Sequence, residues 1–550
     1  MTTQEWWRHA VIYQVYLRSF QDSDGDGGGD LPGVVQKLDY IASLGVDAVW
    51  ISPFFPSPMK DGGYDISDYC AIAPQFGTLS NFQQLLHQAH RRGLKILIDQ
   101  VWSHTSHEHP WFQESRRRRD NPKADWYVWV DAKPDGTPPN NWLSAMGGSA
   151  WTWEPQRQQY YLHNFLAEQP DLNWYNPEVV QAILEVAQFW LELGVDGFRL
   201  DVINFLMHDR QLRDNPLRSP GMNRPDGAHP NDPLFEYINL YNLCRPETLT
   251  VLESIRQLMN RYPGTTTLAE IANAEDSLLS ASEYVSGDKR LQMAYNSTLL
   301  GEKPLSYSWM RPLLERVNSL FQGSVICWTV GTHDYPRVKS RWGQFLPDEP
   351  SIQEAFARLI PALILSLPGS CCLYQGDELG LPQAEVPYEK MQDPLGIAGY
   401  PVMKGRDGSR TPIPWQAEAH QAGFTTAVEP WLPIPDDHRL LAVDQQDKQP
   451  KSLLNHYRRF LHWRKQQLAL TRGNLILLET AEPVLGFIRS CAEQHLLCLF
   501  NLSATSVQFD LSLYPDCVAV EALEFTVKPD GNRLEMSAYG VFFATISKVV

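Results

Sequence analysis

Arg199 and Asp201 stand two residues apart in the stretch VDGFRLDV (195–202), which begins with apolar residues and a glycine and ends in this polar pair. Such a stretch is typical of a buried strand. Because side chains alternate along a strand, the guanidinium and the carboxylate should project to the same side, where the cation holds the acid in place and keeps it ionised. A carboxylate held charged at the end of a buried strand is a candidate nucleophile.

Other apolar runs also end in polar residues. Asp99 and His104 follow one run, Glu270 follows another, and His333 and Asp334 follow a third. Any one of these acids could cap a helix or pair with an arginine. Several acids with one arginine and two histidines on four strand ends are harder to explain as structure, because like charges gathered without nearby lysines are costly. The pattern favours a catalytic group.

Glycoside hydrolysis is the reaction that needs such a set. A retaining mechanism uses one carboxylate as nucleophile and one carboxylic acid as proton donor, about 5–5.5 Å apart. Asp201 suits the nucleophile. Glu270 suits the acid because it follows an apolar strand, where desolvation and nearby negative charge raise a carboxyl pKa. We expect Asp334 to bind sugar hydroxyls and help distort the ring, with His104 and His333 donating hydrogen bonds to hydroxyls.

The elements that must position these side chains are short apolar runs that alternate with amphipathic helical patterns, the signature of a parallel sheet. Eight such units predict an α/β fold, a (β/α)8 (TIM) barrel whose chemistry lies at the carboxyl ends of the strands. A doubly wound open sheet is the weaker alternative, because no G-x-G-x-x-G follows the first strand. The expected strands lie within 10–16, 46–54, 94–102, 195–202, 265–271, 290–296, 324–334 and 370–380.

The βα rhythm is interrupted once and stops near the C-terminus. Residues 104–172 are rich in Trp, Gly, Asn and Pro and too long for a plain loop, so we expect an inserted domain B after the third strand. Residues 474–550 show short alternating apolar segments, which predict a small antiparallel β domain C. Domain A, the barrel, then comprises residues 1–103 and 173–473.

The composition limits the partners. A formal charge of -17 over 550 residues argues against nucleic acid and anionic membranes, which attract basic surfaces. The sequence shows neither a basic-then-apolar leader nor an apolar run long enough to span a membrane, and its 8 cysteines lack metal-ligand spacing. The 18 Trp, 22 Tyr and 22 Phe suit a protein that stacks rings on sugar faces. We expect a cytoplasmic protein with buried free thiols, monomeric or homodimeric, that acts on small molecules.

Several motifs resemble the alpha-amylase family of glycoside hydrolases. GFRLDV, the strand before Glu270 and the pair HD at 333–334 are similar to its three catalytic regions. DQVWSH (99–104), QPDLNW (169–174) and GYDISDY (63–69) are similar to further family motifs. More narrowly, EWWRHAVIYQVYLRSF, LYQGDELGLP and KGRDGSRTPIPW resemble bacterial exo-acting alpha-glucosidases and oligo-1,6-glucosidases. The resemblance runs from residue 5 to about residue 470.

This resemblance implies a role for each matching residue. It implies Asp201 as nucleophile, Glu270 as acid/base and Asp334 as transition-state stabiliser. It also implies contacts to the terminal glucose from Tyr64, Asp65, His104, Arg199, His333 and Arg406.

The glycine-rich turn DSDGDGGGD (22–30) spaces its carboxylates as hard cations require. It resembles the start of an EF-hand loop, although the bidentate glutamate of a true EF-hand is missing. An acidic surface turn is the alternative. The glucosidase family places a structural Ca²⁺ or Mg²⁺ here to pin the loop. The ligands that this resemblance implies are Asp22, Asp24, Asp26, Asp30 and the carbonyl of Gly28.

We therefore expect a retaining exo-alpha-glucosidase that releases alpha-glucose from the non-reducing end of short alpha-glucosides through a covalent intermediate. Valine at position 202, beside the nucleophile, goes with α-1,6 cleavage in the family, so Val202 slightly favours α-1,6 over α-1,4, although valine is also an ordinary filler of barrel strands. A transglucosidase or sucrose-acting enzyme on the same scaffold is the alternative. A non-catalytic sugar-barrel binding protein is a third reading, but such proteins lose catalytic acids that this chain keeps.

Overall fold

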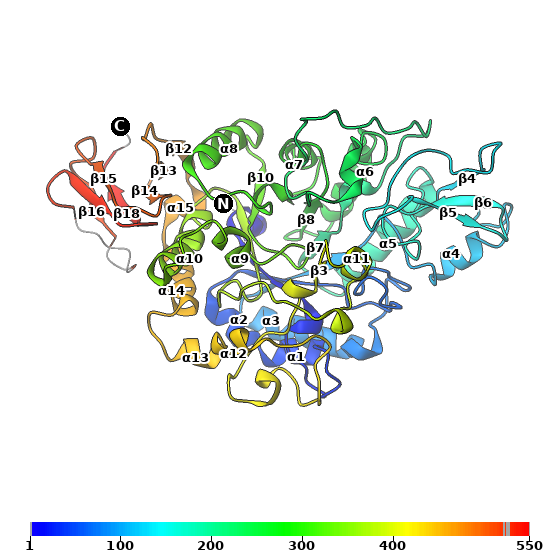
Figure 1. Ribbon diagram of the computed structural model, residues 1–550, viewed down its shortest axis with the longest axis horizontal. Coiled ribbons are helices and arrows are strands. Elements are labelled where there is room, and N and C mark those ends of the chain that lie inside the picture. Colours follow the sequence, from blue (N-terminus) through cyan, green and yellow to red (C-terminus); the bar gives the residue numbers. More distant parts are fainter. Residues whose placement is uncertain (1–2, 521–522, 524–528, 549–550) are drawn as a thin grey trace.

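Eight parallel strands close into a barrel at the centre of the molecule (Figure 1). The computed structural model describes residues 3–520, 523 and 529–548. Around the barrel the strands follow the order β1-β11-β10-β9-β8-β7-β3-β2. They are β1 (Val11–Val15), β2 (Ala48–Ile51), β3 (Lys95–Gln100), β7 (Gly197–Leu200), β8 (Thr266–Ile271), β9 (Met293–Asn296), β10 (Val325–Thr329) and β11 (Ser370–Tyr374). Every strand lies within a run that the sequence predicts, so the TIM barrel is confirmed and the open sheet is wrong.

The barrel strands are almost wholly buried, which explains their continuous apolar runs. Their register sets the site: Asp99 on β3 is paired with Arg199 on β7, and Glu270 on β8 with Tyr295 on β9. Gly197 opens β7 at φ +155°, and a Cβ there would lie 2.0 Å from the carbonyl oxygen of Thr266. Only glycine therefore lets β7 approach β8 closely enough to bring their carboxyl ends together.

A ring of helices covers the outside of the barrel (Figure 1). Residues 31–44 form two helices rather than one, because Lys37 leaves the helical conformation. A short helix between β8 and β9, α7, was not predicted. The covering helices are α1 (Leu31–Gln36), α2 (Leu38–Leu44), α3 (Leu79–Arg91), α5 (Pro177–Glu192), α6 (Thr248–Met259), α7 (Ser277–Tyr284), α8 (Tyr307–Leu320), α10 (Pro350–Ile364) and α14 (Leu453–Gln466).

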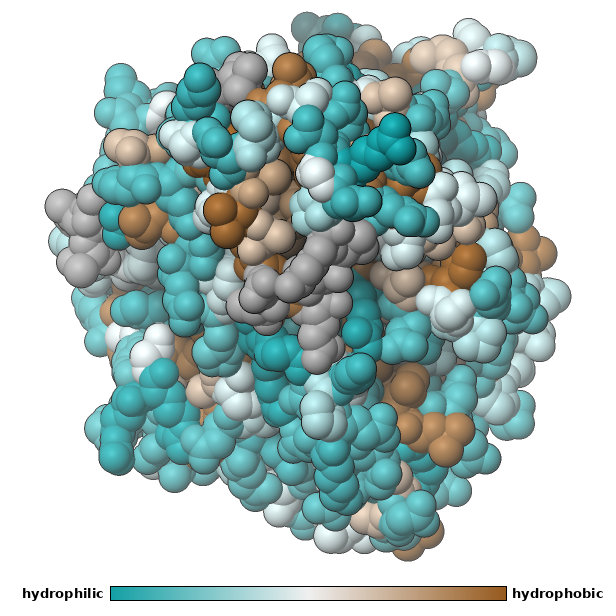
Figure 2. Space-filling model, turned by 90° about the vertical axis from the view of Figure 1, so that its left-hand side faces the viewer, coloured by the Kyte–Doolittle hydropathy of each residue, from teal (hydrophilic) through white to brown (hydrophobic). Residues whose placement is uncertain are grey.

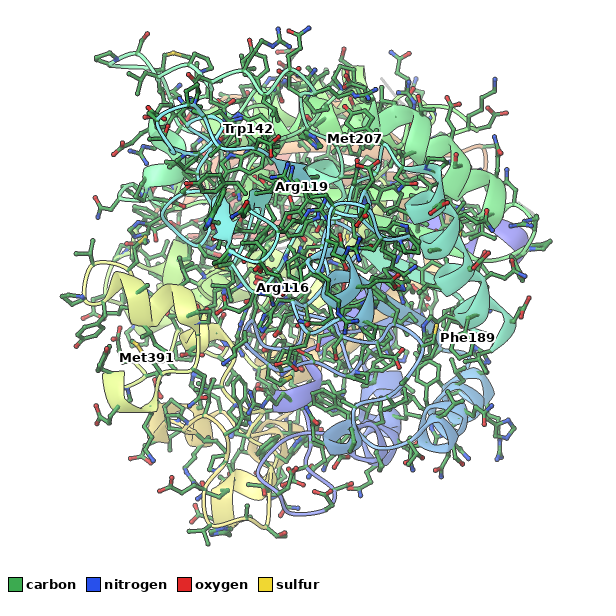
Figure 3. All side chains as sticks on the ribbon, turned by 90° about the vertical axis from the view of Figure 1, so that its right-hand side faces the viewer. Arg116, Arg119, Trp142, Phe189, Met207 and Met391 are labelled. Carbon is green, nitrogen blue, oxygen red and sulfur yellow. The ribbon has the colours of Figure 1, made fainter. Side chains whose placement is uncertain are left out.

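An antiparallel insert follows β3, as the sequence predicts. It contains α4 (Pro110–Ser115) and a sheet of β4 (Trp129–Val130), β6 (Gln159–Leu162) and β5 (Trp151–Glu154), in that order. Trp142, labelled in Figure 3, lies in the core of the insert. Its ring stacks on that of Trp151, with the ring centroids 5.9 Å apart. An isolated bridge between His104 and Asp171 ties the insert to the end of β3. Domain B is thereby held over the carboxyl end of the barrel.

Two long segments follow β7 and β11 at the same end of the barrel. The segment after β11 contains α11 (Pro394–Gly399), α12 (Asp436–Leu440) and α13 (Val443–Asp447), and α9 (Val338–Gly343) follows β10. Short 3-10 helices are η1 (Thr3–His9), η2 (Leu17–Ser19), η3 (Pro74–Phe76), η4 (Ile203–Phe205), η5 (Pro233–Glu236), η6 (Ser297–Leu299), η7 (Tyr388–Lys390), η8 (Asp407–Ser409) and η9 (His420–Gly423).

After α15 (Leu468–Arg472) the chain forms an antiparallel β domain, on the far side of the barrel from domain B in Figure 1. One sheet has the order β12-β13-β14-β18-β16, and β15 pairs with β17. The strands are β12 (Asn474–Leu477), β13 (Val484–Ser490), β14 (His495–Asn501), β15 (Val507–Asp510), β16 (Val518–Ala519), β17 (Arg533–Met536) and β18 (Val541–Ile546). The predicted C-terminal β domain is confirmed.

The surface on this side is mainly hydrophilic, with single hydrophobic residues scattered over it (Figure 2). Across the described ranges, no helix combines the length and the hydropathy that crossing a bilayer requires.

Candidate active site

A cavity of about 890 Å³ opens at the carboxyl end of the barrel. Three acids reach its wall from separate strands: Asp201 follows β7, Glu270 belongs to β8, and Asp334 lies in the loop after β10. Domain B, the segments after β7 and β11, and the loops after β2, β8, β9 and β10 also contribute to the wall. The structure therefore brings together the three acids that the sequence singled out.

Arg199 is fully buried beneath these acids and contacts two of them. Its Nη1 donates to Oδ1 of Asp201 at 2.6 Å and to Oδ1 of Asp99 at 2.8 Å. Its Nη2 donates to Oε2 of Glu270 and to the hydroxyl of Tyr295. One guanidinium thus fixes the carboxylates of β3, β7 and β8 in a single arrangement, as charge-assisted hydrogen bonds do.

The protonation of the two central acids differs from the expectation in one respect. Burial raises the pKa of Asp201, and the charges of Glu270 and Asp99 raise it further, although Arg199 lowers it. Burial likewise raises the pKa of Glu270. Arg199 contacts both acids, so it does not single out Asp201 as the ionised one. Burial therefore raises the pKa of both acids, and the charge of Glu270 adds to this effect at Asp201.

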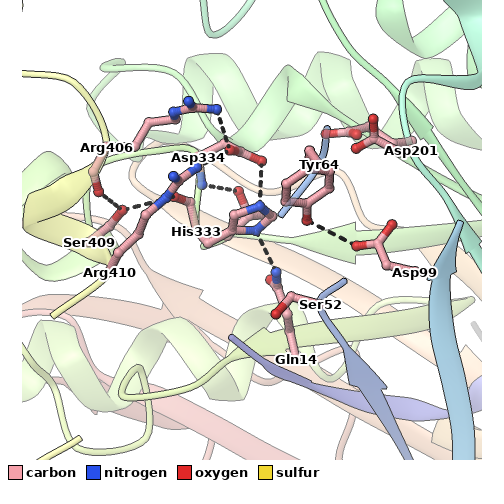
Figure 4. A network of polar contacts seen from close by, with 12 residues as sticks. Gln14, Ser52, Tyr64, Asp99, Asp201, His333, Asp334, Arg406, Ser409 and Arg410 are labelled. Carbon is pink, nitrogen blue, oxygen red and sulfur yellow. Dashed lines mark hydrogen bonds and ion pairs between the residues drawn. The ribbon is translucent and has the colours of Figure 1, made fainter. Parts of the chain in front are cut away.

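The pKa of Asp334 is shifted in the opposite direction, below its usual range. Its Oδ1 accepts from Nη2 of Arg410 at 2.9 Å and from Nη1 of Arg406 at 3.4 Å (Figure 4). Burial raises the pKa of Asp334, but the neighbouring His333 and the two guanidiniums outweigh burial and hold this pKa below its usual range. Asp334 therefore stays ionised when one of the other two acids is protonated.

His333 sits between two aromatic rings under the cavity. Its ring stacks on Tyr64 at 5.3 Å and on Tyr16 at 5.2 Å. The amide nitrogen of Gln14 lies 2.7 Å from Nδ1, so the ring proton belongs on Nε2, which faces Oδ2 of Asp334 at 3.3 Å (Figure 4). Burial keeps the pKa of His333 well below its usual value, so the imidazole is neutral.

The other predicted sugar contacts divide into two groups. Tyr64, His104, Val202 and Arg406 lie on the cavity wall, whereas Arg199, His333 and Asp65 lie behind it. Burial lowers the pKa of His104 to about 4, so this ring is also neutral at ordinary pH.

The expected contact between Asp65 and the terminal glucose does not fit the structure. Asp65 is fully buried, and its carboxylate accepts from Oγ of Ser57 at 2.8 Å and from the backbone N–H of Lys60 at 2.9 Å. It shapes its own turn. Asp61 reaches the cavity instead, where it accepts from Nη2 of Arg406 at 2.7 Å. Asp61 stands four residues before Asp65 and two residues before the motif GYDISDY begins, so the motif pointed to the neighbouring acid of the same turn.

Arg410 was also missed, although KGRDGSRTPIPW contains it four residues after Arg406. It donates through Nε to the carbonyl of His333 at 2.9 Å and through Nη2 to Asp334. A second arginine at that spacing in a motif already assigned to the site was the available signal.

Val202 adopts a left-handed conformation, with φ 33° and ψ 48°. This region is strained for a β-branched residue, and such strain occurs at functional sites. The turn points the backbone N–H of Val202 at Oε2 of Glu270, 3.1 Å away, and places the valine side chain on the cavity wall.

The glycine-rich turn gathers three of its four aspartates. Ligand oxygens of Asp22, Asp24 and Asp30 lie within 4.8 Å of one another. Asp26 lies outside this group; its Oδ1 accepts from the N–H of Gly28 at 2.7 Å. The expectation that Asp26 is a ligand is therefore not supported by the geometry.

Within the described ranges, Asp22, Asp24 and Asp30 form no ion pair with a basic side chain. Asp30 also caps α1, accepting from the N–H of Gly33 at 2.6 Å. Three oxygen donors with uncompensated charge fit a hard cation such as Ca²⁺ or Mg²⁺. Such an ion would join the turn to the start of α1.

Comparisons with known proteins agree with this geometry. Residues 14–473 match the model of the alpha amylase catalytic domain, and residues 475–543 match that of the maltogenic amylase C-terminal domain. A probable alpha-glucosidase of Rhizobium meliloti (strain 1021) is 47% identical over 99% of this chain and 98% of the relative. An oligo-1,6-glucosidase of Halalkalibacterium halodurans is 35% identical over 93% of this chain and 92% of the relative.

Among solved structures, the alpha-glucosyl transfer enzyme XgtA superposes with a TM-score of 0.93 at 50% identity, covering 98% of this chain and 99% of the other. The match spans all three domains. The chain belongs to the alpha-amylase family and is a glycoside hydrolase of the alpha-glucosidase type that acts on alpha-glucoside sugars.

Proposed function

We propose that this protein is a retaining exo-alpha-glucosidase that releases alpha-glucose from the non-reducing end of short alpha-glucosides. The observation that carries the proposal is the meeting of Asp201 and Glu270 on one guanidinium, at the floor of a cavity that Asp334 also lines. In this account Asp201 attacks the anomeric carbon and Glu270 protonates the departing oxygen. Glu270 then takes a proton from water, which releases glucose with its original configuration.

The raised pKa of both acids supports a starting state in which one of the two carries a proton. The arrangement favours one carboxylate and one carboxylic acid, the state that a retaining mechanism requires at its start. Asp334 remains negative throughout and stabilises the positive charge that develops at the anomeric carbon. Arg199 holds Asp201 and Glu270 in mutual position and lies behind the wall, so we propose that it acts without touching sugar.

Exo action is supported by a network of charged side chains on the cavity wall. Asp61 and Arg406 form an ion pair at 2.7 Å, and Arg406 is held in turn by Asp393 at 2.7 Å. Nε2 of Gln169 donates to Asp61 at 3.0 Å. We propose that Asp61 and Arg406 bind the hydroxyls of a single terminal glucose here, together with Tyr64 and His104.

For linkage we propose a modest preference for α-1,6 over α-1,4 bonds, because Val202 flanks the position of the bond to be cut. Transfer of glucose to an acceptor other than water is the second candidate activity, and the 50% identity to an alpha-glucosyl transfer enzyme favours it. Both activities share the same glucosyl intermediate and differ only in the group that resolves it.

We further propose that Asp22, Asp24 and Asp30 hold a structural Ca²⁺, with Mg²⁺ as the other candidate ion and the Gly28 carbonyl as a further ligand. All 8 cysteines are free thiols, which is consistent with a reducing, cytoplasmic location.

Early NMR sampling tests the proposed reaction. With isomaltose or maltose as substrate, the glucose released first should be the alpha-anomer, before mutarotation mixes the two anomers. Beta-glucose in the earliest spectra would overturn the retaining mechanism.

A further inference from the structure

Asn204 lies in η4, three residues after the proposed nucleophile Asp201, and it is fully buried. Its Nδ2 donates to the backbone carbonyl of Ala272 at 2.7 Å, and its Oδ1 accepts from the backbone N–H of the same residue at 3.3 Å. Ala272 follows the proposed acid Glu270 by two residues. One side chain therefore joins the segment that carries the nucleophile to the segment that carries the acid.

This side chain continues the pairing of two barrel strands beyond its regular end. The backbones of β7 and β8 are paired as far as Leu200 and Ala269, where β7 ends. Past that point the chain turns at Val202, and Ala272 is paired with a side chain instead of a backbone. The amide of Asn204 suits this task because it presents a donor and an acceptor side by side, as a backbone does.

Three residues with left-handed backbone conformations lie around Asn204. They are Val202 at φ 33°, Cys244 at φ 49° and Asn273, next to Ala272, at φ 55°. The N–H of Cys244 donates to the backbone carbonyl of Asn204 at 2.8 Å. Such a conformation is unfavourable for a β-branched residue and persists only where the surrounding contacts determine it. The hydrogen bonds of Asn204 tie these three segments together.

The turn at Val202 bears on the reaction because its backbone N–H donates to Oε2 of Glu270 at 3.1 Å. The same oxygen accepts from Nη2 of Arg199. An oxygen that accepts two such hydrogen bonds is held in the form without a proton, and the carboxyl group is fixed in orientation. The proton of Glu270 therefore belongs on its other oxygen, Oε1.

From these contacts we propose that Asn204 is a positioning residue for the acid of the reaction: it fixes the turn at Val202 against the end of β8, so that the Val202 N–H holds Glu270 with Oε1 free to protonate the departing oxygen. The inference rests on the proposed retaining function. Asn204 is not part of the cavity wall, whereas Val202 and Ala272 are, so its effect passes through these two neighbours.

The variant Asn204→Leu removes both hydrogen bonds and keeps the branched shape of the side chain. Two donors separate an effect on the acid from an effect on the fold, because the departing glucose of maltose must receive a proton, whereas the fluoride of alpha-glucosyl fluoride departs with little need for one. We expect kcat/KM for maltose to fall at least about tenfold more than kcat/KM for alpha-glucosyl fluoride. An equal fall with both donors would overturn the proposal.

Asn204→Ser is the milder variant, for use if Asn204→Leu does not fold. Its hydroxyl can keep at most one of the two contacts with Ala272. The same selective loss with maltose should appear, to a smaller extent, and its absence in a folded Asn204→Ser protein would count against the proposal in the same way.

The pH profile gives a second readout. Burial raises the pKa of Glu270, and the N–H of Val202 lowers it. When that contact is loosened in Asn204→Leu, the basic limb of kcat/KM for maltose, which reports an acid that must be protonated, should move to higher pH. A basic limb at its wild-type position would contradict the route through Val202. The variant leaves in place the other charged groups that act on the two acids, which are Arg199, Asp99, Asp201 and Asp334.

Asn501→Leu is the matched control. Asn501 is also fully buried and donates through Nδ2 to two backbone carbonyls, those of Thr505 and Ser537, each at 2.7 Å, but it belongs to β14 of domain C. This variant should lose stability while the ratio of the two kcat/KM values stays at its wild-type level. A ratio that changes in Asn501→Leu as it does in Asn204→Leu would show that the ratio follows stability, and would overturn the assignment.

Glu270→Gln separates this inference from the proposed function. Because kcat/KM reports the steps that lead to the covalent intermediate, loss of the acid should lower it far more for maltose than for alpha-glucosyl fluoride. A selective loss in Glu270→Gln but not in Asn204→Leu would overturn the positioning role alone. Equal losses with both donors in Glu270→Gln would overturn the proposed acid itself.

Discussion

Nη1 of Arg199 donates to Oδ1 of Asp201 at 2.6 Å, and the same guanidinium reaches Glu270 through Nη2. The sequence places the arginine two residues before the aspartate, and the barrel brings the glutamate of the next strand to the other side of the fork. A bidentate, permanently charged group is suited to this task, whereas a lysine would contact one acid at a time. The relationship makes the two acids a coupled pair.

Replacement of Arg410 by glutamine should weaken activity most in acid. Burial would then raise the pKa of Asp334 with less opposing charge, so Asp334 would begin to protonate at higher pH and lose the charge that stabilises the transition state. We expect kcat/KM at about pH 4.5, relative to about pH 7.5, to fall severalfold. Arg118→Gln, at an exposed position, is the control. A uniform loss at every pH would show that Arg410 serves only in packing.

Val202→Thr should change linkage preference with little effect on folding, since the two side chains have nearly the same shape. We expect the ratio of kcat/KM for isomaltose to that for maltose to drop about fivefold or more, on the scale of 1–3 kcal/mol that one small group contributes to discrimination. Initial rates with both disaccharides measure it. If the ratio stays constant, Val202 is a filler of the wall and linkage is decided elsewhere.

Removal of the proposed cation should affect stability before activity. Three carboxylates within 4.8 Å would repel one another once the ion is gone, and the turn would no longer be fixed to α1. EDTA should lower Tm by several degrees, added Ca²⁺ should restore it, and initial rates at low temperature should change little. The variant Asp24→Asn should abolish the response. If neither EDTA nor Ca²⁺ changes the Tm, the loop is a turn that binds no structural cation.

Asp377 makes stability depend on pH. Both of its carboxylate oxygens are buried without a hydrogen-bond partner, and burial raises its pKa to about 7. The native state therefore binds a proton that the unfolded chain releases at about pH 4, so this stabilisation is complete below about pH 4 and is lost as the pH rises through about 7. At pH 8, Asp377→Asn should raise the free energy of unfolding by up to about 4 kcal/mol relative to wild type and so raise Tm. At pH 4 the gain should be small.

Asp196→Asn is the matched control for this stability measurement. Burial raises the pKa of Asp196, but hydrogen bonds from His90 and Lys95 outweigh burial and lower it, so its charge stabilises the fold at neutral pH. This variant should lose stability where Asp377→Asn gains it. Parallel responses of the two variants would contradict the assignment of either group.

Hydrophobic runs and turn residues predict the barrel well because its strands are buried on both faces, as the wholly buried β1 and β10 illustrate. Helix α7 was not predicted, because it has only eight residues, three of them serine, and so carries a weak periodic signal. The three acids could be found because each stands at or just after the end of a strand. The contact of Arg410 with Asp334 could not be predicted, because it depends on how a long loop returns to the barrel.

The choice of Asp65 over Asp61 shows the limit of a motif. Both acids lie in one turn, and only the three-dimensional path of that turn directs Asp61 to Arg406 and Asp65 to the backbone of Lys60 and to Ser57. The pKa of Asp201 shows a related limit. The sequence displays the nearby arginine, whereas burial and the field of Glu270 and Asp99 emerge only when three strands are side by side.

Trapping of the glucosyl intermediate tests the central claim most directly. A 5-fluoro-alpha-glucosyl fluoride should react quickly with the enzyme and hydrolyse slowly, so that the intact protein gains the mass of one fluoroglucosyl group. Peptide mass spectrometry should locate that group on Asp201, and Asp201→Asn should remain unlabelled. A label on another residue, or rapid turnover with inversion and no labelled protein, would contradict the account.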